Sequence, residues 1–96
     1  MRAARPTALR AIDDAIDAVH RLQAGGLRTS AGAPAAPELA RLLDELGARR
    51  REAALGGRVD RNWAGATVRW VAGWLPEDEL GLLARLGAVA RLSPSA

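Results

Sequence analysis

The hydrophobic and polar positions of this 96-residue chain follow a helical period over most of its length. In residues 7–24, large apolar side chains recur three or four residues apart, which places them on one arc of a helix. Thr7 suits the N-cap of this helix, and Gly25-Gly26 is expected to end it. The apolar arc consists of Leu9, Ile12, Ile16 and Val19. The opposite side is expected to carry Arg10, Asp14, Ala18 and Arg21.

Residues 25–37 lack such a period and are rich in glycine, alanine and proline, so we expect a flexible linker. A second helix is predicted from about Pro37, with Glu38 in its first turn, where a negative charge suits the helix dipole. It can continue through Gly47 to Leu55, and Glu45 and Arg49 have the spacing of an i,i+4 ion pair. Its apolar stripe consists of Leu39, Leu42, Leu43 and Leu46.

The three tryptophans, Trp63, Trp70 and Trp74, are the only aromatic residues of the chain. At ~100° per residue they fall within about 40° of one helix face, which predicts a helix over residues 60–75. A strand over residues 67–74 is the alternative, because apolar side chains also alternate there. The strand leaves Trp63 outside the element, and we therefore favour the helix.

A fourth helix is predicted to begin at Pro76, because Glu77, Asp78 and Glu79 would then all lie in its first turn. Its apolar residues run to Leu92. The chain is thus expected to be one all-α domain, a small bundle of three to four helices built from helical hairpins. Residues 1–6 are expected to be a basic disordered tail, residues 38–92 a helical hairpin core, and residues 93–96 a second tail.

The composition makes the tryptophans important to this fold. The chain contains 22 alanines, which bury little area, against 14 leucines, five valines and two isoleucines. A chain of this length buries only a little over ~60% of its unfolded surface. The tryptophans can therefore be core residues of a small bundle or a contact face for a second protein, and a homo-oligomer is consistent with both. The predicted contact face consists of Trp63, Trp70, Val71, Trp74 and Leu75.

Arginine is the only basic residue besides His20, and the absence of lysine is typical of a GC-rich bacterial genome. The run Arg49-Arg50-Arg51, together with Arg58 and Arg61, could contact nucleic-acid phosphates. Acidic residues dilute this run, the formal net charge is only +3, and no helix-turn-helix pattern is present. Nucleic acid is therefore the less favoured partner, and the first hypothesis is a non-catalytic protein–protein interaction module.

Candidate chemistry is sparse. The chain has no cysteine, and His20 is its only histidine. Asp17 and His20 have a carboxylate-to-histidine spacing found in metal-binding bundles, but such sites draw further ligands from other helices. A histidine satisfied by Asp17 at the helix surface is the simpler interpretation. We therefore predict no enzyme activity, no cofactor and no metal, and we expect a cytoplasmic protein without a membrane span.

Overall fold

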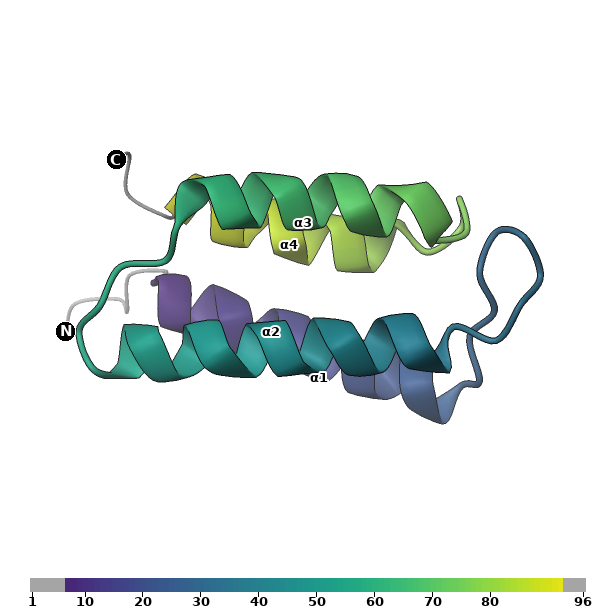
Figure 1. The fold of residues 1–96 in the computed structure, drawn as a ribbon, viewed down its shortest axis with the longest axis horizontal. Helices are drawn as coiled ribbons and strands as arrows, with labels where there is room; N and C mark the ends of the chain where they lie inside the picture. Colours follow the sequence, from purple (N-terminus) through teal and green to yellow (C-terminus); the bar gives the residue numbers. More distant parts are fainter. Residues whose placement is uncertain (1–6, 93–96) are drawn as a thin grey trace, which may run out of the picture.

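The structure is a computed structural model that describes residues 7–92. It contains four helices: α1 (Ala8–Ala24), α2 (Ala36–Ala54), α3 (Arg61–Trp74) and α4 (Leu80–Leu92). Successive helices run in opposite directions, and Figure 1 shows them as two layers of two. The predicted all-α bundle is confirmed. The predicted tails, residues 1–6 and 93–96, lie outside the described residues.

The first helix begins as predicted, since Oγ1 of Thr7 accepts a hydrogen bond of 3.1 Å from the backbone N–H of Arg10. Ile12 and Val19 are fully buried. Ala18, which was expected on the polar side, is also buried, and that expectation is wrong. The reason is that α1 packs against both α2 and α4, so its buried arc is wider than the stripe of large apolar residues.

The tryptophan segment is a helix, and the strand alternative over residues 67–74 is wrong. A carboxylate oxygen of Asp60 accepts a hydrogen bond of 2.8 Å from the backbone N–H of Asn62 and caps α3. The helix ends at Trp74, one residue before a buried leucine that holds an extended backbone. An extended conformation is expected for Leu75 because it precedes Pro76.

The prediction that the fourth helix begins at Pro76 is wrong, because α4 begins at Leu80. Residues 76–79 form a turn that is closed by a hydrogen bond of 3.0 Å from the N–H of Glu79 to the carbonyl of Pro76. The chain needs this turn to bring α4 back antiparallel to α3. Glu77, Asp78 and Glu79 therefore precede the helix and do not fill its first turn.

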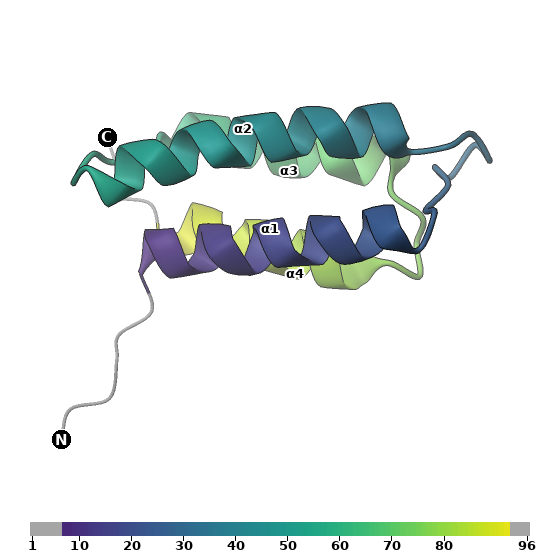
Figure 2. The ribbon, with the colours of Figure 1, turned by 90° about the horizontal axis from the view of Figure 1, so that it is seen from below.

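The four helices occupy the corners of a square, and the two views of the ribbon agree on this arrangement (Figures 1 and 2). The pairs α1–α2, α1–α4 and α3–α4 pack closely. The fourth side is wider, since no Cα atom of α2 lies within 8 Å of one in α3. The core lies between the helices, and its largest fully buried side chains are Ile12, Val19, Leu39, Leu42, Leu46, Val59, Val71, Leu86 and Val89.

The segment that joins α1 to α2 makes several backbone hydrogen bonds. Arg28 and Pro34 form an isolated bridge, and the N–H of Ser30 donates to the carbonyl of Trp74 at 2.8 Å. Ala35 at its end is fully buried. The segment thus contacts the end of α3. That it is flexible stays a prediction from the sequence. In the part of the chain that the structure describes, no helix combines the length and apolar character needed to cross a bilayer.

Candidate functional site

The wide side of the bundle contains the predicted tryptophans and one arginine of the predicted cluster. We call this region the seam, and its residues are Glu38, Arg41, Glu45 and Arg49 of α2 with Trp63, Trp70 and Trp74 of α3. Side chains three or four residues apart share one face of a helix, which aligns each set in a row. Because α2 and α3 are antiparallel, the start of the α3 row meets the end of the α2 row.

Trp63 lies at the end of the seam nearest the α2–α3 connection. Its Nε1–H donates a hydrogen bond of 3.2 Å to Oε1 of Glu45, and the guanidinium carbon of Arg49 lies 5.1 Å from its ring centroid. A second contact orients this guanidinium, because Nη1 of Arg49 lies 2.9 Å from Oε1 of Glu52. The indole is thus held by one hydrogen bond and one cation–π contact from α2.

Arg41 and Trp70 form the accessible middle of the seam. The Arg41 guanidinium carbon lies 4.8 Å from the Trp70 ring centroid, although 67% of the Arg41 side chain is exposed. Nε of Arg41 also lies 3.5 Å from Oε2 of Glu45, so one carboxylate contacts both Arg41 and Trp63. Trp70 meets Trp74 edge to face, with 5.4 Å between ring centroids. The seam is therefore a continuous row of charged and aromatic contacts.

The ion pairs of the seam differ from the sequence prediction. Glu45 pairs with Arg41 and not with Arg49, so the predicted Glu45–Arg49 pair is wrong. Trp63 lies between α2 and α3. Its indole N–H donates to one oxygen of Glu45, and the guanidinium of Arg49 lies over its ring. A sequence rule for an isolated helix cannot include this contact from another helix.

The tryptophans lie between two helices of the same chain, and none of them is fully buried. Each packs against the core, and their bulk fills the gap where the backbones stay apart. Val71 is fully buried on the core side of α3, and Leu75, the residue that follows the helix, is buried as well. Of the five residues predicted to form a contact face, only the three tryptophans have side chains that reach the surface.

The seam also contains polar atoms that have no partner among the described residues. These are Nε1 of Trp74, Oε2 of Glu38 and Nε of Arg49, and all three atoms are buried. A buried donor or acceptor without a partner costs about 1–3 kcal/mol. Water can satisfy such atoms where space permits. More buried polar atoms therefore lack a hydrogen-bond partner at the end of the seam near Trp74 than at the end near Trp63.

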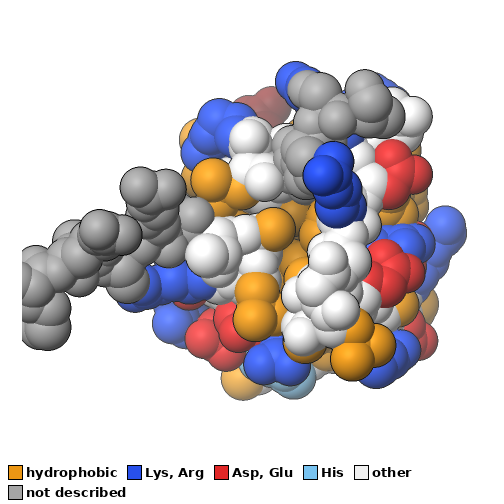
Figure 3. Space-filling view, turned by 90° about the vertical axis from the view of Figure 1, so that its left-hand side faces the viewer, with side chains coloured by type: hydrophobic (Ala, Val, Ile, Leu, Met, Phe, Trp, Pro, Cys, Tyr) orange, Lys and Arg blue, Asp and Glu red, His pale blue; other side chains and the backbone are white. Residues whose placement is uncertain are grey.

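The predicted arginine cluster lies where α2 leads into α3. Arg49 is half-buried against Trp63, and Nε of Arg50 lies 2.6 Å from Oδ1 of Asp13 on α1. Arg51, Arg58 and Arg61 are exposed. Figure 3 views this end of the bundle, and acidic and hydrophobic side chains lie among the basic ones there. The fold thus holds at least Arg49 and Arg50 of this cluster in contacts within the chain.

His20 and Asp17 are both exposed on α1. Over residues 7–92, no three or more histidine or acidic side chains converge in a way that could hold a metal ion. The Asp17–His20 spacing therefore finds no further ligand in the part of the chain described.

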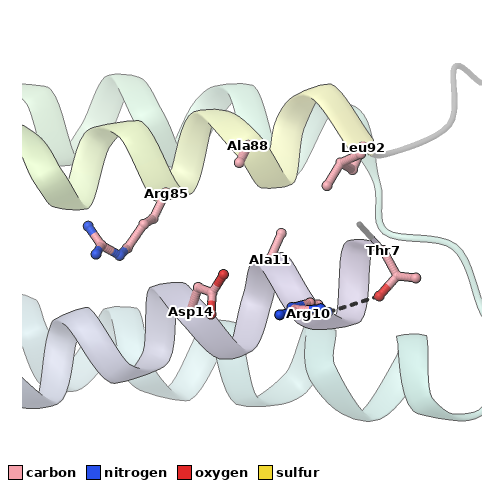
Figure 4. A pocket seen from close by; sticks show the side chains of 7 residues that line it. All are labelled: Thr7, Arg10, Ala11, Asp14, Arg85, Ala88 and Leu92. Carbon is pink, nitrogen blue, oxygen red and sulfur yellow. Dashed lines mark hydrogen bonds between the residues drawn. The ribbon is translucent and has the colours of Figure 1, made fainter. Parts of the chain in front are cut away.

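A groove lies between α1 and α4 that was not predicted from the sequence (Figure 4). One hollow of about 260 Å³ lies beside Ala11 and Ala88, and a second of about 210 Å³ lies beside Ala18 and Gly81. Arg85 borders both hollows, so they follow one another along the same pair of helices. The available signal was the seven-residue spacing of small residues on each helix, which lets two helices approach closely.

The fold and these surfaces define a small antiparallel four-helix bundle with an aromatic–arginine seam on one side and a small-residue groove on another. No protein-family model, curated protein or solved structure matches this chain.

Proposed function

We propose that this chain is a non-catalytic helical module that binds protein, as an accessory subunit, an adaptor or a self-associating scaffold. The observation that carries the proposal is the accessible middle of the seam, where an exposed Arg41 lies over Trp70. Tryptophan and arginine are the residue types most enriched among those that dominate binding energy at protein interfaces. The proposal keeps the cytoplasmic location and the absence of a cofactor as expectations from the sequence.

The way these side chains are held supports the same proposal. Trp70 is fixed by the edge of Trp74 and by the core beneath it, and Glu45 orients Arg41 from the same helix. Side chains held in one geometry lose less conformational entropy when a partner binds. The seam therefore offers a pre-organised surface of aromatic and arginine groups on two helices.

The alternative function is nucleic-acid binding through Arg49, Arg50, Arg51, Arg58 and Arg61. Its support is that all five lie at or near one end of the bundle. Against it, Arg50 is paired with Asp13 and Arg49 with Glu52, and both pairs must be broken before those arginines contact phosphates. Protein is therefore the preferred partner.

Site-specific photo-crosslinking in cells tests the proposal. A photoreactive residue replaces Arg41 in the seam, and a matched control replaces His20, which is exposed on α1. We expect position 41 to form a protein adduct that position 20 does not form, and mass spectrometry to identify it as a second copy or another protein. The adduct must then form again from purified components. Equal labelling at both positions would overturn the proposal, and adducts to nucleic acid would favour the alternative.

A further inference from the structure

The groove between α1 and α4 has a floor of small residues and walls of charged ones. The floor is formed by Ala11 and Ala18 of α1 with Gly81 and Ala88 of α4. At one end of the groove, Leu92 lines the larger hollow and remains 39% exposed. Figure 4 shows its side chain and that of Ala11 in the space between the two helices. The groove thus combines a hollow with an apolar side chain that is not fully covered.

The charges beside the groove are balanced. On α1, four exposed residues fall within about 60° of one face at ~100° per residue. They are Arg10, Asp14, Asp17 and Arg21. From the other side, Arg85 and Glu79 line the second hollow. Three arginines therefore lie beside three carboxylates, and the ion pairs within residues 7–92 involve none of these six side chains.

We propose that this groove is the contact surface between two copies of the chain, related by a two-fold axis. A partner of a single charge sign would place like charges against half of these six side chains. A second copy of the chain supplies both signs. In a two-fold contact the same patch meets itself, so a residue of one copy faces a different residue of the other reciprocally. This surface is separate from the seam, and the inference goes beyond the proposed function without depending on it.

The order of charges along α1 and the position of the larger hollow together select one register. An axis at the level of Val19 would pair Arg21 with Asp17 of the other copy, but it lies beside the smaller hollow. An axis at the level of Ile12, beside the larger hollow, brings Arg10 of each copy to Asp14 of the other, because the two α1 helices are then antiparallel. The same axis brings the two larger hollows face to face and places the exposed Leu92 of each copy beside the hollow of the other. An axis midway between Asp14 and Asp17 would instead oppose carboxylate to carboxylate and arginine to arginine. That register is repulsive.

The size of the surface sets the expected strength of the dimer. α1 has 17 residues, and α4 has 13. At ~1.5 Å per residue and ~10 Å per helix width, the face offers on the order of 500 Å² per copy. The total of roughly 1,000 Å² is near the lower limit for a specific interface. We therefore expect a reversible dimer whose population depends on protein concentration.

Sedimentation equilibrium of the purified full chain tests the proposal. We expect the average mass to rise from monomer toward dimer with concentration. Asp14→Arg places like charges together across the axis and should raise the dimer Kd by about tenfold or more. The double variant Arg10→Asp with Asp14→Arg restores opposite charges and should return Kd to within about threefold of the unmodified chain. Asp44→Arg, an exposed change of the same charge on α2, is the matched control and should leave Kd unchanged.

Leu92→Ser provides a second variant that leaves these charges in place, and it should also weaken the dimer. Circular dichroism checks that each variant is folded. If Asp14→Arg unfolds the chain, Leu92→Ser takes its place in the test. A chain that stays monomeric at every concentration overturns the inference. A dimer that responds equally to Asp14→Arg and Asp44→Arg also overturns it. Neither result bears on crosslinking at position 41, so the groove and the seam are tested separately.

Discussion

The indole Nε1–H of Trp63 donates a hydrogen bond to Oε1 of Glu45, with 3.2 Å between the two atoms, and joins α3 to α2. The backbones of these helices do not approach closely, so long side chains make the connection. Glu45 also contacts Arg41, and Arg49 covers the Trp63 ring. The strength of this side of the bundle therefore depends on a few polar and aromatic groups.

Replacing Trp63 by phenylalanine should destabilise the bundle more than replacing Trp74 by phenylalanine. Trp63→Phe loses the hydrogen bond to Glu45 and weakens the Arg49 stack, at an expected cost of about 1–2 kcal/mol. Nε1 of Trp74 has no hydrogen-bond partner among the described residues, so Trp74→Phe removes no such bond. Urea unfolding followed by circular dichroism measures both. Equal losses would mean that the Trp63–Glu45 bond contributes no net stability.

The ion pair between Arg50 and Asp13 should contribute little despite its distance of 2.6 Å. Both side chains are nearly half exposed, at 48% and 43%, and solvent screens such pairs. A double-mutant cycle with alanine at each position should give a coupling of about 0.2–1 kcal/mol that falls with added salt. The exposed neighbour Arg51 supplies the control cycle with Asp13, and its coupling should be near zero. A coupling unaffected by salt would contradict the screened pair.

Substitution by alanine should cost far more stability at Leu46 of α2 than at Leu55, the C-cap of the same helix. Leu46 is fully buried, and Leu46→Ala should cost about 2–5 kcal/mol through lost burial and the cavity left behind. Leu55 is 89% exposed, and Leu55→Ala should change stability by no more than about 0.5 kcal/mol. Urea unfolding again provides the measurement. A large loss at Leu55 would show that it is covered in solution.

Substitution by alanine should raise the stability of the fold at Gly47 and lower it at Gly57. A methyl group at Gly47 in α2 would meet only a side-chain atom of Arg51 at 3.9 Å, so Gly47→Ala should stabilise the helix by about 0.5–1 kcal/mol. At Gly57 a methyl group would lie 2.8 Å from the carbonyl oxygen of Glu52, which is backbone and cannot move aside freely. Gly57→Ala should therefore lower the Tm and Gly47→Ala should raise it, as thermal unfolding by circular dichroism would record. A higher Tm for Gly57→Ala would contradict the close approach.

Binding to duplex DNA should be weak and only slightly dependent on salt. Within the predicted cluster, Arg49 and Arg50 are held in ion pairs, and the other two members on α2 and the following loop, Arg51 and Arg58, are exposed. Each neutralised phosphate contributes about −0.9 to the slope of log K against log salt concentration, so two give a slope of about −2. Fluorescence anisotropy with a labelled duplex measures it. A slope of about −5 or steeper would require the whole cluster and would support nucleic-acid binding.

The sequence was sufficient to predict the four helices and the main apolar stripe of each, because these depend on short-range chemistry. Thr7 caps the first helix as its position predicts, and the tryptophans share one helix face. The second helix continues from Leu46 through Gly47 to Ala54 without a break. Each of these features follows from neighbours within about one turn, so no tertiary contact was needed to predict them.

The tertiary structure decided which groups these faces meet. In the folded chain Trp63 contacts Glu45, and Ala18 is buried. The last helix begins at Leu80, whereas the sequence predicted a start at Pro76. The fold also brings Ala11 and Ala88, distant in sequence, to one groove. The physical reason is the same in each case: helical periodicity fixes where a side chain points, while the packing of antiparallel helices fixes what lies opposite it.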